Sequence, residues 1–191
     1  IILKKRGHDP ILCEATDTLG GQFLTAGEAP RKKEMKAAAI SMAKKAERLG
    51  VDIRMNTKVT PEMIEEIKPH TVMNAIGAES IIPPIPGVDK AFVKDSHDVL
   101  DGKAEATGNV VVIGGGMVGM ETAEYLAEKG AKVSVLEMLP DICSDMGTTR
   151  KICMGEEIQK SGIIPVTSVK VTEIGDNVVI GEKDGEKVEF P

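Results

Sequence analysis

The 191-residue sequence has very few aromatic residues: three Phe, one Tyr and no Trp. Proteins that bind single-stranded nucleic acids stack bases on aromatic rings, and the net charge of −6 also opposes binding to a polyanion. We therefore expect no nucleic-acid partner. Apolar runs such as 110–113 are far too short to cross a bilayer, so we expect no membrane partner either.

Cysteine is also scarce. Cys13, Cys143 and Cys153 form an odd set without C-x-x-C spacing, which disfavours a disulfide framework and a zinc site. The apolar run at residues 1–3 is too short for the apolar region of a signal peptide. We expect a cytoplasmic protein without a metal site, and we assign no catalytic residue among the cysteines and histidines.

Short apolar runs alternate with segments of helical periodicity, which predicts an α/β fold with a parallel sheet. A stiff Pro-rich connector is expected at 83–87, a loop at 17–27, and hairpin turns at 176–177 and 184–185 in a small β-hairpin appendage. Strands are expected at 11–14, 51–55, 71–76, 110–113 and 132–137, and helices at 31–49, from 60, at 117–129 and at 148–160.

A Gly-rich turn follows the expected strand at 110–113. Its glycines match the pattern G-x-G-x-x-G, and an amphipathic helix follows directly. The first glycine of such a turn permits a sharp bend, the second lets a pyrophosphate approach the backbone, and the third lets helix and strand pack closely. The alternative is a turn that holds no ligand. We predict that a dinucleotide contacts Gly114, Gly115, Gly116, Met117, Val118 and Gly119.

An acidic residue ends the next expected strand. Glu137 lies 18 residues after Gly119 and can accept hydrogen bonds from both hydroxyls of an adenosine ribose. A 2′-phosphate would meet this carboxylate, and residues 138–140 offer no positive charge to receive it, so we expect NAD rather than NADP. Glu121 is expected either near the nicotinamide or as a first-turn acid that interacts with the helix dipole.

Glu14 ends the expected strand at 11–14, as Glu137 ends its own. The same spacing would place a first Gly-rich loop before residue 1. Glu14-Ala15, Leu19-Gly20-Gly21-Gln22, Ala75-Ile76-Gly77-Ala78 and the 114–121 loop are the motifs that carry a family resemblance. Together they resemble the C-terminal FAD- and NAD-binding portion of the 2-enoate reductase / 2,4-dienoyl-CoA reductase / trimethylamine dehydrogenase group of NADH:flavin oxidoreductases.

The resemblance implies two Rossmann-like lobes, both incomplete in this sequence. Residues 1–106 would form a partial FAD-binding lobe without its first strand and Gly-rich loop, and residues 107–191 an NAD-binding lobe without its last strand. The implied partners are the dinucleotides and the rest of the polypeptide, a barrel domain that holds FMN and an iron–sulfur cluster; oligomerisation is left open. The implied FAD contacts are Glu14, Gly20, Gly21, Gln22, Ala75 and Gly77.

The resemblance also implies an enzyme. In an NADH-dependent flavin oxidoreductase of this group, hydride would pass from NADH to FAD and electrons onward to the iron–sulfur cluster and FMN. The activated C=C bond of an enoate or dienoyl substrate would then be reduced, and the fragment alone would be inactive. Two alternatives are a barrel-less flavoprotein of the NADH oxidase or ferredoxin reductase type, and a non-catalytic NAD-binding module.

Overall fold

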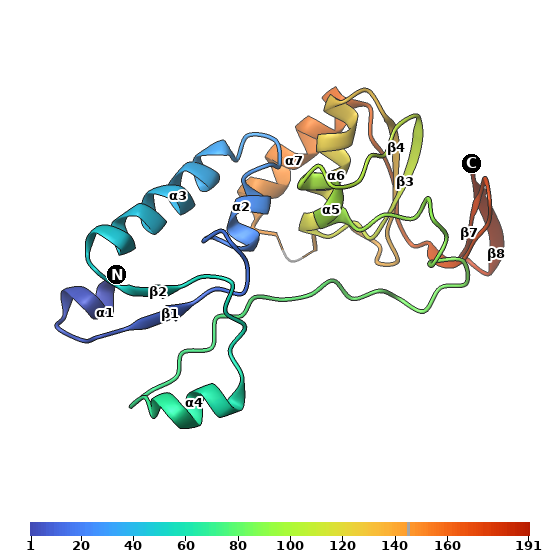
Figure 1. The fold of residues 1–191 in the computed structure, drawn as a ribbon. Helices are drawn as coiled ribbons and strands as arrows, with labels where there is room; N and C mark the ends of the chain where they lie inside the picture. Colours follow the sequence, from blue (N-terminus) through green and yellow to red (C-terminus); the bar gives the residue numbers. More distant parts are fainter. Residues whose placement is uncertain (145) are drawn as a thin grey trace. The chain divides into compact units, whose positions relative to one another are not determined.

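The computed structural model describes residues 1–144 and 146–191. The chain forms two compact units (Figure 1). The first unit contains residues 1–28 and 32–79, and the second contains residues 29–31 and 80–191. No helix in the described part of the chain is long and apolar enough to span a membrane.

The first unit is built around two short parallel strands, in which Ile11 pairs with Asp52. Thr60 begins α4 as predicted, because its hydroxyl accepts a hydrogen bond from the Met63 N–H. Gly50 follows α3 with a positive φ of 69°, which a residue without Cβ adopts readily. The elements are α1 (Ile2–Lys5), β1 (Ile11–Cys13), α2 (Gln22–Ala26), α3 (Lys33–Arg48), β2 (Asp52–Arg54) and α4 (Pro61–Ile67).

Two predictions for the first unit are wrong. The segment 17–27 is not all loop, because α2 forms directly after Gly20 and Gly21, whose positive φ angles turn the chain into the helix. The segment 71–76 is not a strand. No described strand pairs with it, and the side chains of Met73 and Ile76 are 74% and 89% exposed, so neither ladder hydrogen bonds nor burial stabilise an extended conformation.

The second unit contains a three-stranded parallel sheet in the order β3-β4-β5. Helix α6 connects β3 to β4 and packs on both strands (Figure 1), whereas α5 was not predicted. The α/β prediction with a parallel sheet is confirmed. The elements are α5 (Ser96–Leu100), β3 (Asn109–Ile113), α6 (Met117–Glu128), β4 (Lys132–Leu136), α7 (Thr148–Ser161) and β5 (Ile164–Val166).

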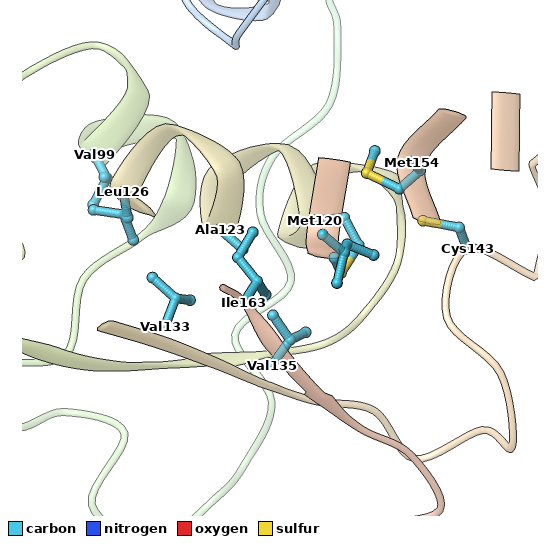
Figure 2. Close-up of a cluster of buried hydrophobic side chains, with 10 residues drawn as sticks. Val99, Met120, Ala123, Leu126, Val133, Val135, Cys143, Met154 and Ile163 are labelled. Carbon is cyan, nitrogen blue, oxygen red and sulfur yellow. The ribbon is translucent and has the colours of Figure 1, made fainter. Parts of the chain in front are cut away.

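The hydrophobic core of the second unit lies between α6 and the sheet (Figure 2). Met120 and Ala123 of α6 and Val135 of β4 have no exposed surface. Cys143 and Met154 belong to the same cluster. Burial of this apolar surface fixes α6 against β3 and β4. The Gly-rich loop connects the end of β3 to the start of α6.

An antiparallel sheet of three strands forms the C-terminal part of the second unit. The turn at Asp184 and Gly185 has two positive φ angles, as a two-residue hairpin requires. The connector at 83–87 docks on this sheet, because the Ile174 N–H donates to the Pro86 carbonyl. The second unit therefore begins upstream of residue 107, and the assignment of 1–106 and 107–191 as lobes stays a prediction. The strands are β6 (Lys170–Ile174), β7 (Val179–Lys183) and β8 (Glu186–Phe190).

Candidate dinucleotide-binding site

The loop between β3 and α6 lies at the carboxyl edge of the parallel sheet. Ile113, the last residue of β3, pairs with Leu136, the last residue of β4. The register therefore brings Gly114 and Glu137, the residues that follow these two strands, to the same edge. Open α/β sheets bind their ligands at this edge.

Helix α6 begins with an open N-terminus. Gly116 is its exposed N-cap residue, and its carbonyl accepts from the Met120 N–H at 3.0 Å. Within the described chain, no side chain caps this helix start and no first-turn residue is acidic. The helix amides that precede Met120 are therefore available to an anion, and the helix dipole adds to their attraction.

The backbone before Gly116 is held by the end of β4 and the residues after it. The Gly114 N–H donates to the Leu136 carbonyl at 2.8 Å, and the Gly115 N–H donates to Glu137 Oε2 at 2.7 Å. The Gly115 carbonyl accepts from the Cys143 N–H at 2.8 Å. Three consecutive peptide planes thus have a fixed orientation.

The Glu137 carboxylate has two backbone partners, because its Oε1 accepts from the Leu139 N–H at 2.7 Å. A carboxylate has about four lone-pair positions, so both oxygens keep capacity for the ribose hydroxyls that the sequence analysis assigns to Glu137. The structure adds a second role for this side chain, which is to hold the Gly-rich loop.

Gly119 allows the close contact between α6 and the loop. A Cβ added at Gly119 would lie 2.0 Å from the Gly114 carbonyl oxygen, whereas a Cβ at Gly116 would meet no protein atom within 4 Å. The space beside Gly116 is therefore open to a ligand, as a pyrophosphate requires. Met117 and Val118, also predicted contacts, are 44% and 46% exposed.

Glu121 does not lie in the first turn of α6, so its interpretation as a first-turn acid is wrong. Glu121 is 8% exposed, and its Oε1 lies 3.8 Å from Arg150 Nη2 of α7. The predicted position near a nicotinamide stays a prediction.

A second, deeply buried glutamate lies one turn further along α6. Glu124 is 2% exposed, and its Oε1 lies 2.8 Å from Arg31 Nη2, in the 29–31 segment of the same unit. Neither carboxylate oxygen accepts a hydrogen bond from the described residues. Burial raises the pKa of Glu124, and the opposing charges of Arg31 and Arg150 offset this only in part.

Two of the implied FAD motifs meet within the first unit. Gln22 Nε2 donates to the Ala78 carbonyl at 2.7 Å, which joins the Gly20-Gly21-Gln22 turn to the exposed segment that contains Ala75 and Gly77. Glu14 Oε1 accepts from the Thr16 N–H and hydroxyl, both at 2.8 Å. Both bonds use Oε1, so the carboxylate keeps acceptor capacity after the end of β1.

The three cysteines differ in their exposure to solvent. Cys143 is buried, Cys13 is half-buried and Cys153 is exposed, and no disulfide joins them in the described part of the chain. The described His, Cys, Asp and Glu residues form no group of three that could hold a metal ion. In the part of the chain that the structure describes, the three thiols therefore lie in different environments and form no disulfide.

Arg31, Ile142 and Cys143 were missed by the sequence analysis. Arg31 and Cys143 adopt positive φ angles of 62° and 47°, which are uncommon for residues other than glycine, asparagine and aspartate. No motif marks them, because their roles depend on contacts with residues distant in sequence.

Comparison with known proteins identifies long relatives that contain a similar region. Bilirubin reductase from Mediterraneibacter gnavus is 40% identical over 186 residues, which cover 97% of this chain and 29% of that protein. NADH oxidase from Thermoanaerobacter brockii is 42% identical, with 91% and 27% covered. The structure of 2-naphthoyl-CoA reductase with 2-naphthoyl-CoA has a TM-score of 0.90 and 29% identity, with 98% and 28% covered. The chain thus spans less than a third of each relative.

The sequence matches the family described as "Pyridine nucleotide-disulphide oxidoreductase" over residues 40–190. The predicted resemblance to the enoate and dienoyl reductase group is confirmed by this match and by the similarity to 2-naphthoyl-CoA reductase. FAD and a nicotinamide dinucleotide are the cofactors of this family, which confirms the cofactor prediction at that level. The chain belongs to the pyridine nucleotide-disulphide oxidoreductase family.

Proposed function

We propose that this chain is the NADH- and FAD-binding part of a larger flavin oxidoreductase. The observation that carries the proposal is the open N-terminus of α6, which has Gly116 exposed and Glu137 at the same edge of the sheet. A non-catalytic NAD-binding module has no need for the second group of motifs around Gln22 and Ala78. When bound, NADH supplies a hydride and FAD accepts it.

The residues of the second unit would bind and orient the nicotinamide dinucleotide. The exposed Gly116 amide and the following amides of α6 would hold the pyrophosphate, and Gly119 would keep the helix close to the loop. Glu137 would accept the ribose hydroxyls and repel a 2′-phosphate, which favours NAD over NADP. Met117, Val118 and Glu121 would complete the contacts.

The residues of the first unit would hold FAD. Glu14 lies at the end of a parallel strand, where a carboxylate can accept ribose hydroxyls. Gly20, Gly21 and Gln22 would border the cofactor on one side, and Ala75 and Gly77 on the other, since the Gln22–Ala78 hydrogen bond joins these segments.

The substrate and the further domain belong to the proposal as well. We infer that electrons pass from FAD to FMN and an iron–sulfur cluster in a barrel domain, where an activated C=C bond is reduced. The likeness to 2-naphthoyl-CoA reductase supports this inference, and the three cysteines without C-x-x-C spacing disfavour a disulfide reductase. A cytoplasmic location is part of the same proposal.

Anaerobic mixing of the full-length protein with NADH or NADPH tests the function. NADH should bleach the oxidised flavin absorbance faster than NADPH, and an α,β-unsaturated carboxylate or thioester should restore it. Failure of NADH to reduce the flavin would contradict the proposal. Reoxidation by dioxygen alone would instead favour the type of activity named by the NADH oxidase relative.

A further inference from the structure

The residues after β4 pack directly against the Gly-rich loop. The Cys143 N–H donates to the Gly115 carbonyl at 2.8 Å, and a Cβ at Gly115 would lie 2.9 Å from Ile142 Cγ2. Gly115 is buried, whereas Gly116 is exposed. Residues 142 and 143 therefore touch the buried side of the loop.

We propose that Cys143 is a positioning residue that aims the Gly116 N–H at the pyrophosphate. This inference rests on the proposed function. In a planar trans peptide the C=O and the N–H point in opposite directions. The Cys143 N–H fixes the Gly115 carbonyl on the buried side, and the Gly116 N–H of the same peptide consequently points to the exposed side.

The backbone of Cys143 makes this contact in a restricted conformation. Its φ is 47°, in the left-handed region that non-glycine residues seldom adopt. The side chain is 1% exposed and lies in the core cluster with Met120 and Met154 (Figure 2). The side chain thus packs in the core, whereas the contact with Gly115 is made by the backbone N–H alone and depends on this φ.

Substitutions of Cys143 separate the positioning role from core packing. A β-branched residue strongly resists a left-handed conformation, so Cys143→Val should displace the donor. Cys143→Gly keeps the N–H and adopts the same φ freely, although it loses the buried side chain. Asp184→Val is the matched control, because Asp184 has a φ of 54° in the β7–β8 turn of the same unit.

Amide hydrogen exchange and NADH titration of the 191-residue chain provide two readouts. Without ligand, Cys143→Val should exchange faster over residues 113–119, and its NADH dissociation constant should rise about tenfold, as for the loss of one hydrogen bond to a charged group. Cys143→Gly should bind NADH like the wild type despite a lower melting temperature. Asp184→Val should change neither readout.

Two results would overturn the proposal: unchanged exchange over 113–119 in folded Cys143→Val, or an equal loss of NADH affinity in Cys143→Gly. If Cys143→Val does not fold, Gly115→Ala perturbs the same contact from the loop side, because its Cβ would lie 2.9 Å from Ile142 Cγ2. It should also exchange faster over 113–119. Hydrogen exchange alone is the readout for this variant, because the same Cβ would lie 3.0 Å from Glu137 Cβ. If the wild type binds no NADH, the proposed function fails, but the exchange comparison still decides whether Cys143 orders the loop.

Discussion

Replacement of Gly119 by alanine tests the close contact between α6 and the Gly-rich loop. In the interior of a helix, alanine is normally more stable than glycine by about 0.5–1 kcal/mol. Here the added Cβ would lie 2.0 Å from the Gly114 carbonyl oxygen and 3.1 Å from its carbon. Ordinary non-bonded contacts lie at about 3.5 Å, so α6 would have to move more than about 1 Å from the loop.

We expect this clash to reverse the normal effect of alanine. Overpacking of this kind costs about 1–3 kcal/mol, which for a chain of this size lowers the melting temperature by roughly 2–12 °C. Circular dichroism melts without ligand measure the change. Gly155→Ala in α7 is the matched control, because its Cβ would meet nothing within 4 Å and should raise the melting temperature slightly. A Gly119→Ala variant at least as stable as the wild type would refute the contact.

Gly116→Ala should behave in the opposite way. Its Cβ would meet no protein atom within 4 Å and its φ of −71° suits any residue, so the cost should be no more than about 0.5–1 kcal/mol for a poorer N-cap. The methyl group would occupy the space in which the pyrophosphate approaches the backbone. We expect NADH binding to be lost in a titration of the folded variant. Normal NADH binding would mean that the loop is only a turn.

Three further substitutions test other parts of the two units. Glu137→Gln should weaken the binding of NADH by about 1–3 kcal/mol and the binding of NADPH by less. Titration with both cofactors measures the ratio of their affinities, and an unchanged ratio would mean that Glu137 does not recognise the ribose. The raised pKa of Glu124 means that the folded state binds this proton more tightly, so wild-type stability should rise as pH falls from neutral toward the ordinary value of 4.5. In denaturant melts across this pH range, Glu124→Gln should lack this pH-dependent gain in stability. Glu128→Gln is the control for the change in net charge. Gln22→Ala in the full-length protein should lower the ratio of bound flavin to protein, whereas exposed Gln159→Ala should not.

The strands and helices of the second unit could be predicted because their signals are local. The apolar runs at 110–113 and 132–137 and the helical periodicity from 117 to 129 match β3, β4 and α6 within one residue at each end. The Gly-rich turn between two such elements defines its own bend and helix start. Sequence reasoning therefore located the loop and the acidic residue at the end of β4.

Local signals fail where a conformation depends on distant contacts. The segment 71–76 has the composition of a strand, but a strand also needs a partner, and no described strand pairs with it. The orientation of the loop amides depends on Glu137 and Cys143, which follow the next strand. The motif leaves open space beside Gly116, and the residues after β4 contact the backbone of Gly115.

The net negative charge of the chain opposes the proposed binding of an anionic dinucleotide at the start of α6. Glu121, Glu124 and Glu128 all lie on this helix, and unpaired carboxylates there would weaken the field at its N-terminus. Arg150 lies near Glu121, and Arg31 lies within 4 Å of both Glu124 and Glu128. Arg31 also contacts Glu157, so the two arginines offset only part of the negative charge on this helix. If the proposed site is correct, the amides at the start of α6 must attract the pyrophosphate at short range against the remaining charge of the acids behind them.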